Sequence, residues 1–170
     1  GILSAAAREG FLSTVHTVSH QLTKDARATA DGEMAEDTFI ARYGHLRPGT
    51  YDITSPRYDD DPARFLQPLV EHAREAVMDS ENPGPWQAER GAFFAALAKL
   101  GLPADPEVVE CFLRQAIEGR EYAKFIFSRN LSAALEALAE VGASYHLERD
   151  QVANLSLEEL LALRTSARPD

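Results

Sequence analysis

Cysteine is almost missing from this sequence of 170 residues, which contains one, Cys111. A single thiol cannot form a disulfide within the chain, and this excludes the small secreted folds that disulfides hold together. Cys111 lies in Val-Val-Glu-Cys-Phe-Leu at 108–113, a largely apolar segment with helical periodicity. That context predicts a buried and unreactive thiol.

Long apolar runs and basic residues are also scarce. No stretch approaches the ~18–20 apolar residues that span a bilayer, and the first residues lack a signal-peptide pattern. Lysine and arginine number 17 against 27 aspartates and glutamates, which gives a formal net charge of −10. A surface that binds nucleic acid needs the opposite balance. These absences predict a soluble, cytoplasmic protein with neither a membrane nor a nucleic-acid partner.

The common motifs of nucleotide, metal and nucleophile sites are missing as well. The sequence has no G-x-x-x-x-G-K-S/T phosphate loop, no G-x-G-x-x-G and no G-x-S-x-G. His16 and His20 stand four residues apart, as two zinc ligands on one helix face do, but no glutamate follows His16 and no third ligand is suggested. We therefore predict no metal site and no cofactor bound by these residues.

Helical periodicity covers most of the chain, and proline or glycine marks its interruptions. The expected helices cover residues 2–30, 33–43, a broken segment from 61 onward, 86–100, 106–141 and 157–164. The local signals at their ends are a cap at Asp61, stops at Gly101 and Gly142, and a Ser156–Glu159 capping box, and Leu100 is expected to face inward. Only residues 50–54 have the composition of an extended segment. The pattern predicts an all-α fold: an irregular helical domain of about five to seven helices with one long ordered loop. We expect a single domain over residues 1–170, excised from a longer protein, because residue 1 is glycine rather than methionine.

The loop after the second expected helix carries an unusual set of side chains. Residues 43–58 contain two arginines, a histidine, an aspartate and three tyrosines, with glycines and prolines that restrict the backbone. Arginine suits phosphate or carboxylate, and histidine transfers protons near neutral pH. One interpretation is a site for an anionic substrate. The other is that Asp52 pairs with Arg47 or Arg57 and only ties the loop to the helices.

A second basic cluster lies within the longest expected helix. Arg120 and Lys124 are four residues apart, so two like charges share one helix face. This pair either faces an anion or extends into solvent beside Glu118 and Glu121.

Both clusters resemble the central helical part of the phosphoenolpyruvate-utilising family. The resemblance is carried by Gly-His-Leu-Arg-Pro-Gly-Thr-Tyr-Asp-Ile at 44–53, Ser-Pro-Arg-Tyr at 55–58, Asp-Pro at 61–62, Arg-Glu-x-x-Lys-Phe-x-x-Ser-Arg at 120–129 and Leu-Ser-Leu-Glu-Glu-Leu at 155–160. That family contains phosphoenolpyruvate synthase, pyruvate phosphate dikinase and, closest in this region, rifampin phosphotransferase. The similar region extends from about residue 39 to 163.

The resemblance implies a mechanism. In this family an ATP-grasp domain uses ATP and Mg²⁺ to phosphorylate a histidine on a swivelling domain, which carries the phosphoryl group to a small-molecule acceptor. The implied partners are these two domains of the same chain and the acceptor, which the helical region of rifampin phosphotransferase holds. Neither an ATP-grasp pattern nor the Gly-Gly…Ser-His phosphohistidine signature is present, so we expect residues 1–170 alone to be inactive. Where rifampin-type enzymes have another Gly-Pro-Gly with an acidic residue, residues 47–52 read Arg-Pro-Gly-Thr-Tyr-Asp, and no antibiotic is inferred.

Phosphoryl transfer depends on positioning and on charge stabilisation, which the basic residues of the two clusters suit. The predicted catalytic residues are His45 and Asp52, with Asp52 as a base or orienter for an acceptor hydroxyl. The predicted substrate- or phosphate-binding residues are Arg47, Arg57, Arg120 and Lys124. The alternatives are a purely structural helical spacer, or a stand-alone interaction module without a substrate site.

Overall fold

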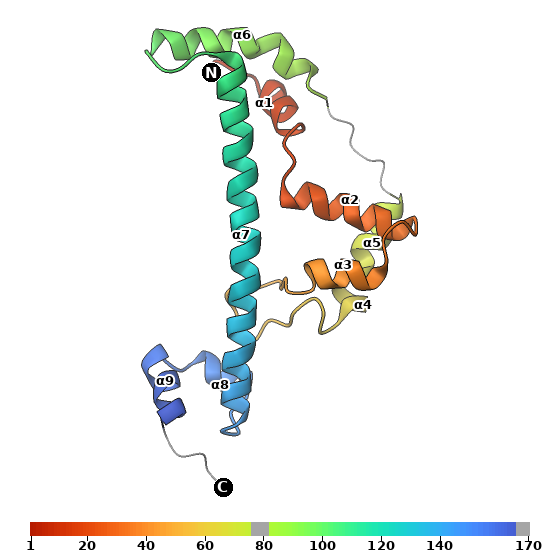
Figure 1. The fold of residues 1–170 in the computed structure, drawn as a ribbon, viewed down its shortest axis with the longest axis vertical. Coiled ribbons are helices and arrows are strands. Elements are labelled where there is room, and N and C mark those ends of the chain that lie inside the picture. Colours follow the sequence, from red (N-terminus) through yellow and green to blue (C-terminus); the bar gives the residue numbers. More distant parts are fainter. Residues whose placement is uncertain (76–81, 166–170) are drawn as a thin grey trace. The chain divides into compact units, whose positions relative to one another are not determined.

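The computed structural model describes residues 1–75 and 82–165, and the regular structure in these ranges is helical throughout (Figure 1). The helices are α1 (Ala5–Leu12), α2 (Val18–Ala30), α3 (Glu36–Tyr43), α4 (Pro62–Phe65), α5 (Gln67–Glu75), α6 (Gly84–Lys99), α7 (Pro106–Ala143), α8 (Arg149–Ala153) and α9 (Leu157–Thr165). The all-α prediction is confirmed. Residues 50–54, expected to be extended, form turns instead. Within the described ranges, no helix is both long and apolar enough to cross a membrane.

The expected helix over residues 2–30 is two helices, which is one reason why the described ranges hold more helices than expected. Near the end of α1, the hydroxyl of Ser13 donates to the Gly10 carbonyl and that of Thr14 to the Phe11 carbonyl. Such hydroxyls offer the backbone an alternative to the helical ladder. The Thr17 hydroxyl then accepts from the His20 amide at the start of α2. The apolar spacing continues through the break, so periodicity alone did not reveal it.

The described residues group into two compact units. Unit 1 contains residues 1–21 and 82–123, and unit 2 contains residues 22–75 and 124–165. The chain of α7 belongs to unit 1 as far as Ala123 and to unit 2 from Lys124. A single domain over the whole chain stays a prediction.

Aromatic side chains form the core of unit 1. Phe11 of α1 lies against Trp86 of α6, with ring centroids 5.0 Å apart, and Phe94 is buried beside them. Leu100, which was expected to face inward, is 72% exposed, because the chain turns away through Gly101 at a φ of 69°. The prediction of a buried thiol is also wrong, since Cys111 is exposed on α7.

Two apolar clusters stabilise unit 2. The first contains Phe39 and Tyr43 of α3 with Leu66, and Phe125 of α7 packs against it. The second contains the following residues from the loop, α7 and α8: Ile53, Ala139 and Val152. The loop therefore contributes to the core of unit 2 through Ile53.

The start of α9 and the end of α7 differ in how well local signals in the sequence predicted them. At α9, the Ser156 amide donates to Glu159 Oε2 at 2.7 Å and the Glu159 amide donates to Ser156 Oγ at 3.2 Å, which confirms the predicted capping box. Gly142 was expected to stop α7, but it lies inside the helix against Val152 of α8. The left-handed residue after α7 is His146, at a φ of 60°.

Candidate functional site

Arg47 is the centre of the loop between α3 and α4. Its side chain is 1% exposed, and its Nη2 donates to Ser132 Oγ at 3.0 Å and to Glu136 Oε1 at 2.8 Å, both on α7. Its Nη1 donates to the carbonyl of Ser55 at 2.9 Å and to that of Asp52 at 3.3 Å. The guanidinium group is therefore held inside unit 2 and closes the loop around itself.

Glu136 extends this network to α8. Its second carboxylate oxygen lies 2.5 Å from Arg149 Nη2, and Arg149 Nη1 donates to the Ile53 carbonyl at 3.0 Å. The hydrogen bonds from Arg149 and then Arg47 lower the pKa of Glu136. Sequence reasoning missed this carboxylate and its partners on α7 and α8. The available signal was the spacing of Ser132 and Glu136, which places them on one face of a helix.

Arg57 forms a second ion pair within the loop. Its Nε and Nη2 lie 2.7 and 2.5 Å from the two carboxylate oxygens of Asp59, whose hydrogen bond raises the pKa of Arg57. The amide of Asp59 donates to the Gly44 carbonyl at 3.1 Å, which brings the two ends of the loop together. A Cβ at Gly44 would lie 2.6 Å from the Ile40 carbonyl oxygen and 2.7 Å from Asp59 Cβ, so only glycine fits.

Asp52 presents an exposed carboxylate. It accepts hydrogen bonds from the Thr54 amide at 2.9 Å and the Thr54 hydroxyl at 2.7 Å, and these bonds lower its pKa. Arg47 reaches the main-chain oxygen of Asp52, and the carboxylate pairs with Thr54. The expected connection between the loop and the helices forms through Arg47, and the Asp52 carboxylate does not take part in it.

His45 is buried, with 6% of its surface exposed. Among the described residues, neither ring nitrogen has a hydrogen-bond partner. The ring meets the edge of Phe125 with centroids 4.7 Å apart. Burial lowers the pKa of His45, and the charges of Arg129 and Arg57 lower it further. The imidazole is therefore neutral at pH 7 and packs against α7.

The remaining predicted residues lie on α7. Arg120 belongs to unit 1, where its side chain is 72% exposed and lies 3.8 Å from Glu121. Lys124 belongs to unit 2 and is exposed. Unit 2 thus contains five of the six predicted residues, four of them on the loop.

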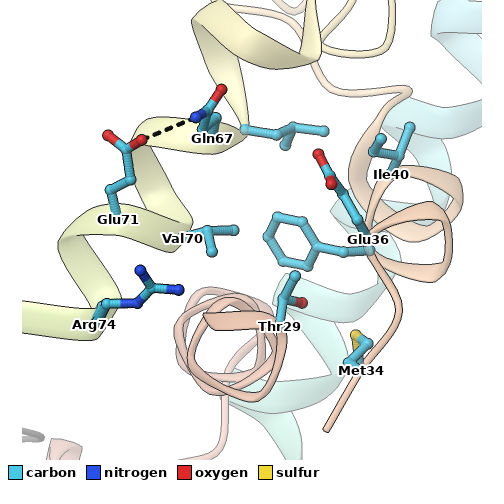
Figure 2. A pocket seen from close by; sticks show the side chains of 10 residues that line it. Thr29, Met34, Glu36, Ile40, Gln67, Val70, Glu71 and Arg74 are labelled. Atoms are coloured by element: carbon cyan, nitrogen blue, oxygen red, sulfur yellow. Dashed lines mark hydrogen bonds between the residues drawn. The ribbon is translucent and has the colours of Figure 1, made fainter. Parts of the chain in front are cut away.

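Unit 2 also contains a cavity that sequence reasoning did not find. Its volume is about 420 Å³, and it opens between α2, α3 and α5 (Figure 2). The lining residues are Thr29, Met34, Glu36, Phe39, Ile40, Leu66, Gln67, Val70, Glu71 and Arg74. The six predicted site residues are not among them. Its apolar members were interpretable from the sequence only as core residues, because a cavity and a filled core have the same periodicity.

A comparison with protein families gives a match over most of the chain. The family model described as the rifampicin phosphotransferase fourth domain matches residues 3–129. The match includes the loop, the cavity-lining residues and α7 as far as Arg129. No curated protein and no solved structure matches the chain.

Proposed function

The chain belongs to the rifampicin phosphotransferase fourth-domain family, and from this premise we propose that it is the acceptor-binding helical domain of an ATP-dependent phosphotransferase. In this proposal an ATP-grasp domain with Mg²⁺ phosphorylates a histidine on a swivelling domain of the same protein. That histidine then transfers the phosphoryl group to a small molecule held by unit 2.

The cavity between α2, α3 and α5 is the observation that carries the proposal. Its volume of about 420 Å³ lies in the usual range of small-molecule sites, about 300–1,000 Å³. Phe39 and Leu66 form a buried apolar floor, while Glu36, Glu71 and Arg74 provide charge at an exposed rim. The accessible lining of the cavity is more polar than apolar, and its charged groups can orient a ligand.

The loop residues take different roles within this proposal. The donors of Arg47 and Arg57 already bind Glu136 and Asp59, so a phosphate would have to displace a carboxylate from either arginine. We assign these arginines to the support of unit 2. Asp52 and Lys124 lie outside the cavity lining, so this proposal requires the reacting hydroxyl of the acceptor to extend beyond the cavity, where the exposed Asp52 carboxylate orients it and Lys124 meets the phosphoryl group.

The test uses the complete phosphotransferase. Asp52→Asn is expected to lower kcat by about 10²–10⁴-fold, because it removes a positioned base, while far-ultraviolet circular dichroism stays unchanged. Lys124→Ala is expected to lower kcat with little effect on acceptor binding. The matched control is Asp37→Asn, which changes an exposed carboxylate on α3 that does not line the cavity. Wild-type turnover in both variants contradicts the assignment.

A connecting spacer is the second candidate function, and the Arg47–Glu136–Arg149 network favours it. This network stabilises the loop against α7 and α8 without leaving the Arg47 guanidinium open to a ligand. If the domain is only a spacer, substitutions of the residues that line the cavity leave the KM for the acceptor at its wild-type value. If it binds the acceptor, Val70→Phe raises that KM because the larger side chain fills the cavity.

A further inference from the structure

We propose that the cavity between α2, α3 and α5 binds a small organic cation, namely a protonated amine carried on an apolar body. That this cation is also the phosphoryl acceptor rests on the proposed function, whereas the binding of a cation in the cavity does not depend on it.

The apolar part of the cavity is already formed by the fold. Phe39 is fully buried and Leu66 is 2% exposed, and both belong to the first apolar cluster of unit 2. Met34, Ile40 and Val70 are partly buried and pack against the same cluster. The apolar body of a ligand therefore meets a preformed surface, and the protein loses little conformational entropy when the ligand binds.

Two carboxylates stand on opposite walls of the cavity. Glu36 lies on α3 and Glu71 on α5, with Val70 between them (Figure 2). Glu71 accepts a hydrogen bond from Gln67 Nε2 at 2.9 Å, which restricts its position. Within the described ranges, the Glu36 carboxylate forms neither a hydrogen bond nor an ion pair, so its charge is available to a ligand.

The one cation of the rim is already engaged. Arg74 Nη2 donates to the Ala30 carbonyl at 3.0 Å, at the end of α2. Two carboxylates and one guanidinium give the rim a net negative charge, which repels an anionic ligand and attracts a cationic one. The charge of the rim thus favours a cationic ligand.

The experiment compares three probes of one shape and different charge: 4-phenylbutylamine, 4-phenylbutanol and 4-phenylbutanoate. Each is titrated into the ¹⁵N-labelled chain and followed by amide chemical shifts. The amine is expected to bind with a Kd of about 1 mM, as a fragment of this size allows, and at least about tenfold more tightly than the carboxylate. The shifted amides are expected in α2, α3 and α5.

Variants separate the charge from the apolar surface. Glu36→Gln combined with Glu71→Gln is expected to weaken amine binding about tenfold and to leave alcohol binding unchanged. Asp37→Asn with Glu75→Gln, two exposed carboxylates of the same helices outside the cavity, is the matched control and is expected to change neither. All four positions are exposed, and thermal unfolding checks that the fold is retained.

Equal affinities for the amine and the carboxylate overturn the proposal, as does amine binding that Glu36→Gln with Glu71→Gln leaves unchanged. Absence of amine binding up to about 10 mM overturns it as well, since even a small fragment reaches that affinity in a preformed site. Amine binding in the chain together with unaffected phosphoryl transfer by the Val70→Phe complete protein supports the cation site and contradicts the proposed function. The experiments thus distinguish a failure of the cation site from a failure of the proposed function.

Discussion

His45 is a buried residue whose surroundings oppose a positive charge. Burial and the nearby Arg129 and Arg57 lower its folded-state pKa below the ordinary 6.5, although Asp59 acts in the opposite direction. The unfolded chain binds the proton more readily, so the contribution of His45 to stability is complete above about pH 6.5 and is lost as the pH falls below it. The free energy of unfolding from urea titrations should decrease from pH 7 to pH 5, and less so in His45→Gln.

His72→Gln, at an exposed position on α5, is the matched control substitution for this comparison. A His45 ring that titrates at or above 6.5 in an NMR experiment on the folded chain contradicts the prediction.

Cys111 offers a second test of a single residue. Because its thiol is exposed on α7, the folded chain should release one equivalent of thionitrobenzoate from Ellman's reagent without denaturant. Cys111→Ser should release none. Reaction only after the addition of urea would agree with the buried thiol that the sequence predicts, and would contradict the structure.

At the scale of elements, the loop depends on the ion pair between Arg47 and Glu136. Arg47→Ala leaves Glu136 with only Arg149 as its partner and opens a gap in the buried interior. This substitution should lower the free energy of unfolding by about 3 kcal/mol. Arg57→Ala breaks a pair whose side chains are 25% and 30% exposed, and should cost about 1 kcal/mol or less. Urea unfolding of both variants measures the difference, and equal losses contradict the central role of Arg47.

The two glycines inside α7 should respond to alanine with opposite signs. Gly142→Ala places a Cβ against the side chain of Val152 and should cost about 1–3 kcal/mol in the free energy of unfolding. A Cβ at Gly119 meets nothing within 4 Å, so Gly119→Ala should stabilise the chain by up to about 1 kcal/mol. Thermal unfolding should show Tm values on opposite sides of the wild-type value.

Local chemistry explains which elements were predictable. The cap at Asp61, the Ser156–Glu159 box and the turn at Gly101 each involve residues within one turn of the helix end, so the sequence displays them directly. The position of Gly142 inside α7 depends on packing against α8, which no local pattern records. For the site, the ordered loop was predictable, but the partners of Arg47 on α7 were not, because they lie 85 and 89 residues away. The charged rim of the cavity was missed for the same reason.

At the scale of the whole molecule, the dominant electrostatic property is the net charge of −10. Repulsion among the acidic groups favours expanded states, and salt screens it over about 10 Å at 0.1 M. The Tm should therefore rise as NaCl increases from 10 to about 150 mM, and tetramethylammonium chloride at equal ionic strength should act similarly. A Tm that falls in both salts would show that screened ion pairs outweigh the repulsion.

The hydrogen bonds of Arg47 also impose an order on synthesis by the ribosome. Arg47 cannot form its ion pair until Glu136, 89 residues later, has been synthesised. The Ile53 carbonyl gains its donor only with Arg149, 96 residues later. At the usual elongation rate of 5–20 residues per second, these delays are about 4–19 s. During that time the nascent loop has only its local pairs, such as Arg57 with Asp59. The loop thus emerges well before its native partners on α7 and α8, and a nascent chain that ends before Ser132 should expose Arg47 to proteases that recognise basic residues.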